Sequence, residues 1–174
     1  MAAAADNILW IDCEMTGLEL KEDRILEIAC IATNAQLEPL DAGIEFIVKT
    51  EKEVLEKMND CKYTMSEIDS LVAAYVSKHF PPSTPALLAG NSVHADRAFI
   101  NKDLPLLASK LHYRILDVSS IKEISRRWYP TLMGGGGYKS KDESEHRALS
   151  DIKSSIDELK FYRQHLFKPV EGCK

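Results

Sequence analysis

The fold of this chain is decided by its first apolar run, Ile8-Leu9-Trp10-Ile11-Asp12-Cys13-Glu14. Successive side chains of a strand point to opposite faces, so the run predicts a strand on which Asp12 and Glu14 share one face and Cys13 takes the other. Two neighbouring carboxylates repel each other, and a divalent cation such as Mg²⁺ or Mn²⁺ relieves that repulsion. Taken alone, however, two acids at a strand end are more often ordinary polar residues than a metal site.

The size and composition of the chain fit one compact domain. Its 174 residues are 45% apolar, and we expect a single domain over residues 1–174 in which 1–6 and the glycine-rich 133–145 are flexible. The net charge of −5 and the pI of about 5.6 argue against a protein that coats long duplex nucleic acid. A short phosphate-bearing substrate is compatible with this charge.

The four cysteines are scattered without the C-x-x-C spacing of a zinc site, and two of them fall in apolar strands. A reducing compartment is therefore expected. The N-terminus lacks the pattern of a secretory signal, and no apolar run is long enough to cross a membrane. We expect a cytoplasmic protein without a membrane partner; mitochondria are the alternative, although no presequence is visible.

Hydrophobic periodicity divides the chain into two halves. Strands at 8–14, 24–33 and 43–49 follow one another through short turns, which predicts an antiparallel meander. Beyond residue 66 the hydrophobic period becomes helical, and helices then alternate with short strands. We expect a helix capped by Ser66, a strand at 86–90, a helix beyond Asp96, a strand at 113–116, a helix at 119–128 with Ile121 and Ile124 facing inward, and a last helix at 147–165.

These elements predict an α/β fold. Strands that alternate with helices require crossover connections, so the second half adds parallel strands to the meander and the helices cover the resulting mixed sheet.

Three further polar residues could join the first two acids. On the last helix Asp151 falls at the edge of the buried stripe that contains Ala148, and His146 falls at the entry of that helix. Asp96 follows a buried strand at its carboxyl end, where open α/β sheets place their ligands. A metal ligand beside a histidine base is one interpretation, and a solvated helix start is the alternative.

Together these motifs resemble the DEDDh 3′-to-5′ exonucleases, and in detail they resemble the oligoribonuclease family. The closer resemblance lies in Trp10-Ile11-Asp12-Cys13-Glu14-Met15-Thr16-Gly17-Leu18, Ala89-Gly90-Asn91-Ser92-Val93, His112-Tyr113-Arg114-Ile115-Leu116-Asp117-Val118-Ser119 and His146-Arg147-Ala148-Leu149. The resemblance implies a ribonuclease-H-like fold and a homodimer. It also implies cleavage of very short single-stranded RNAs, dinucleotides especially, to nucleoside 5′-monophosphates.

The same resemblance assigns the chemical roles. Asp12, Glu14 and Asp151 would hold one divalent cation, Mg²⁺ or Mn²⁺, with Asp12 shared with a second cation and Asp96 completing the cluster. Two cations can stabilise both the attacking and the leaving oxygen at phosphorus. His146 would act as the general base.

Residues that bind substrate are also implied by the resemblance. Leu18 would be an apolar wedge against the terminal base, although a core leucine is the alternative. Ser92, Arg114 and Ser119 would cap the 5′-phosphate, a role that suits a guanidinium and two hydroxyls. Tyr113 would reach into the site of the partner subunit, which makes dimerisation a condition for activity.

The chain departs from the family between Lys62 and Tyr63. At this point relatives usually carry a further segment with a Trp and a His-His-Gly stretch, and here the segment is absent. Base–aromatic stacking contributes about 1–3 kcal/mol per base in single-strand binders, so its loss would weaken binding. Two alternatives follow: a DEDDh exonuclease of broader specificity, or a catalytically impaired RNA-binding variant.

Overall fold

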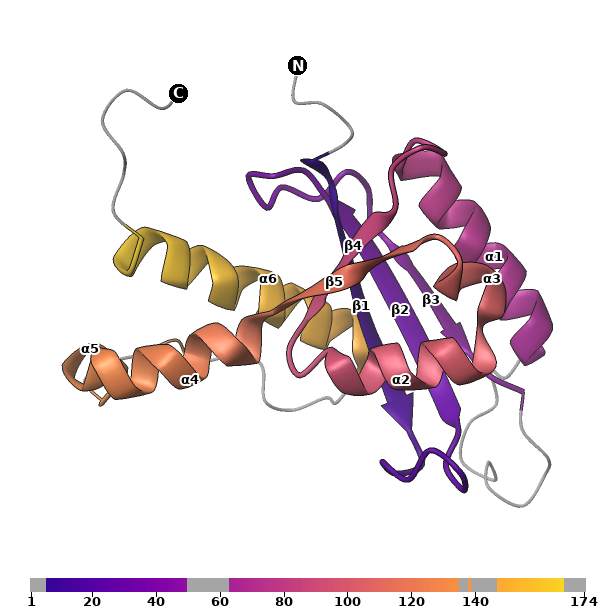
Figure 1. The fold of residues 1–174 in the computed structure, drawn as a ribbon, viewed down its shortest axis with the longest axis horizontal. Helices are drawn as coiled ribbons and strands as arrows, with labels where there is room; N and C mark the ends of the chain where they lie inside the picture. The colour runs from indigo at the N-terminus through magenta and orange to yellow at the C-terminus, as the bar shows by residue number, and fades with distance from the viewer. Residues whose placement is uncertain (1–5, 50–62, 135–137, 139–146, 168–174) are drawn as a thin grey trace.

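The computed structural model describes residues 6–49, 63–134, 138 and 147–167, and Figure 1 shows their arrangement. A five-stranded mixed sheet has the order β3-β2-β1-β4-β5. Its strands are β1 (Ile8–Met15), β2 (Ile25–Thr33), β3 (Ile44–Ile47), β4 (Ala86–Gly90) and β5 (Leu111–Asp117). The first three pair antiparallel, and β4 and β5 join parallel to β1. The predicted α/β fold, with its meander and parallel strands, is confirmed.

The described residues form six helices. They are α1 (Met65–His79), α2 (His94–Asp103), α3 (Pro105–Ala108), α4 (Val118–Trp128), α5 (Pro130–Gly134) and α6 (Ala148–His165). Figure 1 shows α1, α2 and α3 beside one another, while α4 and α6 extend side by side away from these three helices, to the left in this view. No helix in these described residues is long and apolar enough to cross a membrane.

The alternation of β1 builds two cores. Leu9, Ile11 and Cys13 pack with α1, α2 and α3 on one face of the sheet. Ile8 and Trp10 pack with α6 on the other face, and the buried Trp10 indole donates a hydrogen bond to Thr33 Oγ1 at 3.0 Å. Because the side-chain period of a strand is two, the residues that follow Trp10 on its face come out beneath α6.

The pairing of β1 with β4 ends early, which leaves the last residues of β1 without β4 as a neighbour. The two strands pair only from Ile8–Leu87 to Trp10–Ala89. At Gly90 a Cβ would come within 2.9 Å of the Ile11 carbonyl oxygen, so only glycine permits this approach. Beyond it β4 turns away, and the end of β1 is left beside α2 and α6.

In some details the structure differs from the predictions made from local sequence pattern. Helix α1 begins after Thr64, whose side chain and Glu67 form a capping box, so Ser66 is not the N-cap as predicted. Ile124 does not face inward, because 44% of it is exposed. The short α3 was not predicted; the Asp69 carboxylate of α1 accepts from its Leu106 and Leu107 N–H groups at 2.9 Å, a cap that no local pattern reveals.

The flexible segment 1–6 and the flexible loop 133–145 were part of the single-domain prediction, which stays a prediction. Residues 1–5 lie outside the described residues, as do 135–137 and 139–145. Met133 and Gly134 belong to α5, another short helix that was not predicted, and the Tyr138 ring lies 6.3 Å from the Phe161 ring of α6.

Candidate active site

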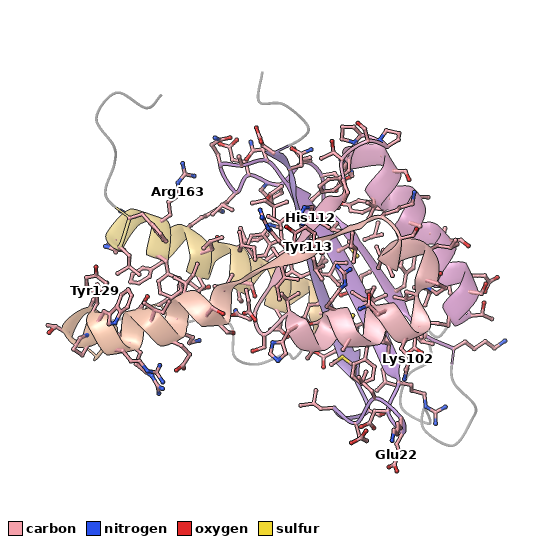
Figure 2. All side chains as sticks on the ribbon, in the orientation of Figure 1. Glu22, Lys102, His112, Tyr113, Tyr129 and Arg163 are labelled. Atoms are coloured by element: carbon pink, nitrogen blue, oxygen red, sulfur yellow. The ribbon has the colours of Figure 1, made fainter. Side chains whose placement is uncertain are left out.

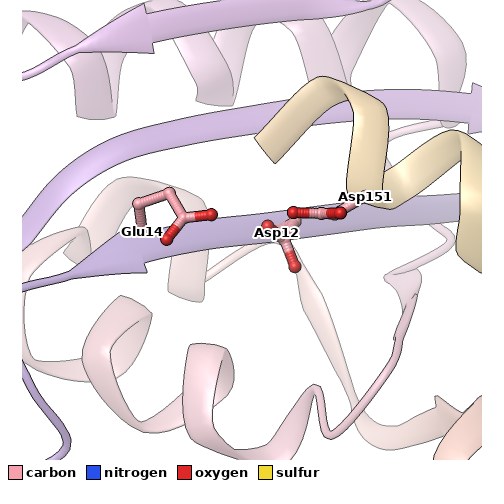
Figure 3. Close-up of side chains that lie close together, drawn as sticks. All are labelled: Asp12, Glu14 and Asp151. Atoms are coloured by element: carbon pink, nitrogen blue, oxygen red, sulfur yellow. The ribbon is translucent and has the colours of Figure 1, made fainter. Parts of the chain in front are cut away.

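Three carboxylates meet where β1 ends beneath the start of α6. Asp12 and Glu14 come from β1 and Asp151 from the first turn of α6, and one oxygen of each lies within 4.8 Å of the other two. Figure 3 shows the three side chains turned toward one another. The predicted alternation therefore holds, because Asp12 and Glu14 share the α6 face while the buried Cys13 belongs to the opposite core.

The electrostatics of this cluster favour a cation. Burial raises the pKa of Asp12 to about 8, and the negative charges of Asp96, Asp151 and Glu14 add to the effect. Oxygen-only donors of this kind suit hard divalent cations. The residues present fit a divalent metal, so the cluster is a candidate metal centre.

Asp96 lies beside the cluster on α2. It is 5% exposed, and its Oδ1 accepts the Cys13 N–H of β1 at 2.9 Å. Burial raises its pKa to about 6, although hydrogen bonds from the Cys13 and Asp96 backbone N–H groups lower it in part. Asp96 is not one of the three residues whose oxygens lie within 4.8 Å, but its charge acts directly on Asp12.

Two acids of the sheet hold the start of α6, and sequence reasoning missed both. The helix has no side-chain N-cap of its own. Instead, Glu27 of β2 accepts the Ala148 N–H at 3.2 Å and Glu45 of β3 accepts the Leu149 N–H at 3.3 Å. Negative charge is favourable at a helix N-terminus. The available signal was Glu27 itself, a charged residue inside the apolar run 25–32.

A loop at the end of β1 presents Leu18. This side chain is 75% exposed, which excludes the core alternative. The Asp23 carboxylate accepts from Thr16 Oγ1 at 2.6 Å and from the Glu19 N–H at 2.8 Å, inside the loop. A Cβ on Gly17 would overlap that carboxylate.

The amine of Lys102 fastens the same loop to α2. It donates to the Leu20 carbonyl at 3.1 Å and to the Asp23 carbonyl at 2.6 Å. Figure 2 labels Lys102 at the end of α2 near this loop. Sequence reasoning missed both Asp23 and Lys102, because neither contact follows from the local pattern.

The predicted phosphate-binding residues are brought together only in part. Ser92 and Ser119 are in direct contact, with 3.2 Å between their hydroxyl oxygens. The guanidinium of Arg114 lies 5.3 Å from the centre of the Tyr113 ring on β5. Tyr113 is 76% exposed and its ring stacks on that of His112. Figure 2 labels both residues on β5. His146 lies outside the described residues.

Comparison with known proteins extends these observations. The family model described as Exonuclease matches residues 9–74 and 70–159, which include the three clustered acids and Asp96. The chain therefore has the fold of an exonuclease domain.

Curated relatives narrow the class. An oligoribonuclease from Rhodococcus jostii is 42% identical over 184 residues, covering 96% of this chain and 91% of that protein. The oligoribonuclease of Corynebacterium glutamicum is 41% identical over 190 residues (99% and 85%), and that of Mycobacterium tuberculosis is 42% identical over 184 residues (96% and 84%). This chain belongs to the oligoribonuclease family.

Solved structures of more distant proteins share the fold. Exonuclease I from Methylocaldum szegediense superposes with a TM-score of 0.70 at 16% identity, covering 92% of this chain and 41% of that one. Exonuclease I from E. coli in complex with a dT13 oligonucleotide gives a TM-score of 0.68 at 14% identity, covering 91% and 41%. This chain thus spans about two fifths of their length, and the likeness concerns the fold alone.

Proposed function

We propose that this protein is a 3′-to-5′ exoribonuclease that hydrolyses short single-stranded RNAs, dinucleotides especially, to nucleoside 5′-monophosphates with the help of two divalent cations. The observation that carries the proposal is the cluster of Asp12, Glu14 and Asp151, whose oxygens lie within 4.8 Å of one another. The membership of the oligoribonuclease family gives this cluster its chemical context.

In this proposal Asp12, Glu14 and Asp151 would hold Mg²⁺ or Mn²⁺, Asp12 would also contribute to a second cation, and Asp96 would complete the set. When bound, the cations supply positive charge to the oxygens of the reacting phosphate. His146, which precedes the N-cap of α6 by one residue, takes the proton from the attacking water.

The chain's own residues would also place the substrate. The exposed Leu18 packs against the terminal base, held by the loop that Asp23 and Lys102 fix. Ser92, Ser119 and Arg114 bind the 5′-phosphate of the dinucleotide. The Arg114 guanidinium lies 5.3 Å from the centre of the Tyr113 ring on the same strand.

We propose a homodimer formed through β5 and α4. The strand β5 is at the edge of the sheet, and its Tyr113 is 76% exposed. On α4, Ile124 and Trp128 are 44% and 71% exposed, and both line an apolar cavity of about 210 Å³ between α4 and the end of α6. Exposed apolar side chains of this kind are typical of interfaces between subunits. A second copy would cover it and receive Tyr113.

We also propose that the protein is cytoplasmic. The thiols of Cys13 and Cys30 are free and buried, which suits a reducing compartment.

One observation supports a second candidate, a catalytically impaired RNA-binding variant. The alignment with the Rhodococcus jostii protein runs over 184 residues, whereas this chain has 174, so that relative carries at least ten residues that have no counterpart here. The family model matches in two pieces that meet within α1, close to the expected gap after Lys62. Residues 50–62 themselves lie outside the described residues.

The decisive experiment is hydrolysis of a 5′-labelled RNA dinucleotide with Mn²⁺, with Asp12→Ala as the matched inactive variant. Release of labelled monophosphate by the wild type alone is the expected result. Binding without cleavage by the wild type would favour the impaired variant. Equal efficiency on a long RNA would favour an exonuclease of broader specificity.

A further inference from the structure

The side chain of Asn91, at the exit of β4, uses both of its N–H donors and its carbonyl oxygen in hydrogen bonds. Its Nδ2 donates to Ser155 Oγ and to Glu158 Oε2, both at 3.0 Å, and its Oδ1 accepts from Ser119 Oγ at 3.0 Å. The mechanism proposed above does not use this residue. Asn91 thus links α6 to the two serines that face the substrate.

Glu158 decides which way the Asn91 amide points. This glutamate of α6 is only 3% exposed, and its other oxygen accepts from Tyr162 Oη at 2.7 Å and pairs with Lys122 Nζ at 3.2 Å. An ionised carboxylate only accepts hydrogen bonds. Turning the amide over would set the Asn91 oxygen against the carboxylate, so Nδ2 faces Glu158 and Oδ1 has to face Ser119.

The orientation of the Asn91 amide also fixes where the Ser119 hydroxyl donates its proton. A hydroxyl has one proton to donate, and Ser119 gives it to Asn91. Ser119 Oγ also accepts the Ser92 backbone N–H at 3.0 Å, so Ser119 can only accept in its contact with the Ser92 hydroxyl. The Ser92 proton is the one that can rotate toward an incoming anion.

Ser92 is itself held in an uncommon backbone conformation. Its φ of 50° lies in the left-handed region, which is costly for a residue with a Cβ. The N-cap residue of α4, Asp117, accepts the Ser92 N–H at 3.0 Å and the Ser119 N–H at 2.9 Å. The two serines therefore have a fixed separation before any ligand arrives.

We infer that Asn91, oriented by Glu158, is a positioning residue that makes Ser92 the hydroxyl donor to the 5′-phosphate and Ser119 its fixed support. The inference rests on the proposed function, since it concerns the phosphate end of the same substrate. It gives Ser92 and Ser119 different roles, whereas the family resemblance assigns them the same one. A phosphate that took the Ser119 proton would leave the Asn91 carbonyl, half-buried, without its donor.

The test compares an RNA dinucleotide that carries a 5′-phosphate with the same dinucleotide that lacks it. The measured quantity is the ratio of the two kcat/KM values, which an overall loss of folding or of metal binding leaves unchanged. Asn91→Ala should lower this ratio about tenfold, mainly through KM, because one hydrogen bond to a charged group is lost or misdirected. Asn101→Ala, which alters an exposed asparagine of α2, is the matched control.

Two further variants set the scale. Arg114→Ala removes the guanidinium and shows how much preference the phosphate provides in all. Glu158→Gln keeps the shape of the anchor but offers Asn91 an amide group as well as a carbonyl, so it should lower the ratio by less than Asn91→Ala. This second variant keeps the test valid if Asn91→Ala does not fold.

The outcomes separate the inference from the function on which it rests. A wild type that shows no preference for the 5′-phosphate overturns the phosphate cap and this inference together. A wild-type preference that is lost in Arg114→Ala but unchanged in both Asn91→Ala and Glu158→Gln overturns the inference alone. A rise in the ratio for Asn91→Ala would show that Ser119 is the donor, since its proton would then be released.

Discussion

The carboxylate of Glu27, near the start of β2, accepts a hydrogen bond from the backbone N–H of Ala148, the first residue of α6, at 3.2 Å. These residues are 121 positions apart, yet the contact fixes the turn of helix that carries Asp151. Glu45 makes the same kind of contact with Leu149. The start of α6 is thus capped by the sheet on which the other two cluster acids lie.

Glu27→Ala should lower both stability and activity. The free energy of unfolding should fall by about 1–3 kcal/mol, because a buried N–H group loses its partner. Glu27→Gln keeps an acceptor and should retain more of both. Urea denaturation and the kcat for a dinucleotide are the measurements. Exposed Glu22→Ala is the control, and an unchanged kcat in Glu27→Ala would show that the cap does not position Asp151.

Asp12→Asn should separate activity from stability. Hydrolysis should fall about a thousandfold or more, since charge stabilisation by bound cations contributes several kcal/mol. The melting temperature of the metal-free protein should rise, because burial and four neighbouring acids raise the pKa of Asp12 in the folded state, and the substitution removes the cost of that raised pKa. Added Mn²⁺ should raise the melting temperature of the wild type and not that of the variant.

The control for this prediction is Asp157→Asn, on the exposed side of α6, which should behave like the wild type. A metal-free Asp12→Asn protein that melts lower than the wild type would contradict the electrostatic account of the cluster.

Gly17→Ala should impair substrate binding. A Cβ at this position would displace the Asp23 carboxylate and with it the loop that presents Leu18. We expect the KM for a dinucleotide to rise several-fold while kcat changes little. Lys102→Met, which removes the amine from the Leu20 and Asp23 carbonyls, should act in the same direction. Lys153→Met, on exposed α6 surface, is the control, and wild-type KM values in both loop variants would argue against this role.

Trp128→Glu should convert a dimer into monomers. A charge on the apolar surface of α4 should cost about 2 kcal/mol or more of association energy, the size typical of a central interface residue. Sedimentation of the wild type and the variant measures the state, and activity should fall with it. Leu106→Glu, at an exposed site on α3, should leave the state unchanged. A monomeric wild type would reject the proposed dimer.

Asp41 should make stability depend on acid pH. Burial raises its pKa, but hydrogen bonds outweigh that effect and hold the pKa below its ordinary value. They come from Lys78, the Gly43 N–H, Tyr75 and His79, all at 2.8–2.9 Å. A carboxyl whose folded pKa is depressed stabilises the fold above its unfolded pKa, and this contribution is lost as the pH falls toward the folded pKa.

Asp41→Asn should therefore be less stable than the wild type by about 1–2 kcal/mol at pH 7, and the difference should shrink below about pH 4. Urea denaturation at both pH values measures it. Lys78→Met should have a small effect, since the lysine side chain is 63% exposed. A difference that is the same at pH 7 and pH 3 would contradict the assignment to Asp41 ionisation.

Local pattern was enough to place the five strands, the four longer helices and part of the site. The alternation of residues 8–14 correctly put Asp12 and Glu14 on one face, and the helical stripe of the last helix put Asp151 at its buried edge. Ala148, Ile152, Ile156 and Leu159 are all buried as that stripe predicts. These features depend on the periods of two and 3.6 residues, which are properties of neighbouring residues.

The tertiary structure decided which hydrogen bonds the acids and hydroxyls form. Ser66 looked like an N-cap from its spacing alone, but the chain caps α1 with Thr64. Likewise the partners of Glu27, Lys102 and Asn91 lie elsewhere in the chain, 28 to 121 residues away. The sequence by itself determined that the chain has an α/β sheet and which face of their elements Asp12, Glu14 and Asp151 occupy. The fold decided the hydrogen-bond partners, because hydrogen-bond distance depends on how separate elements pack.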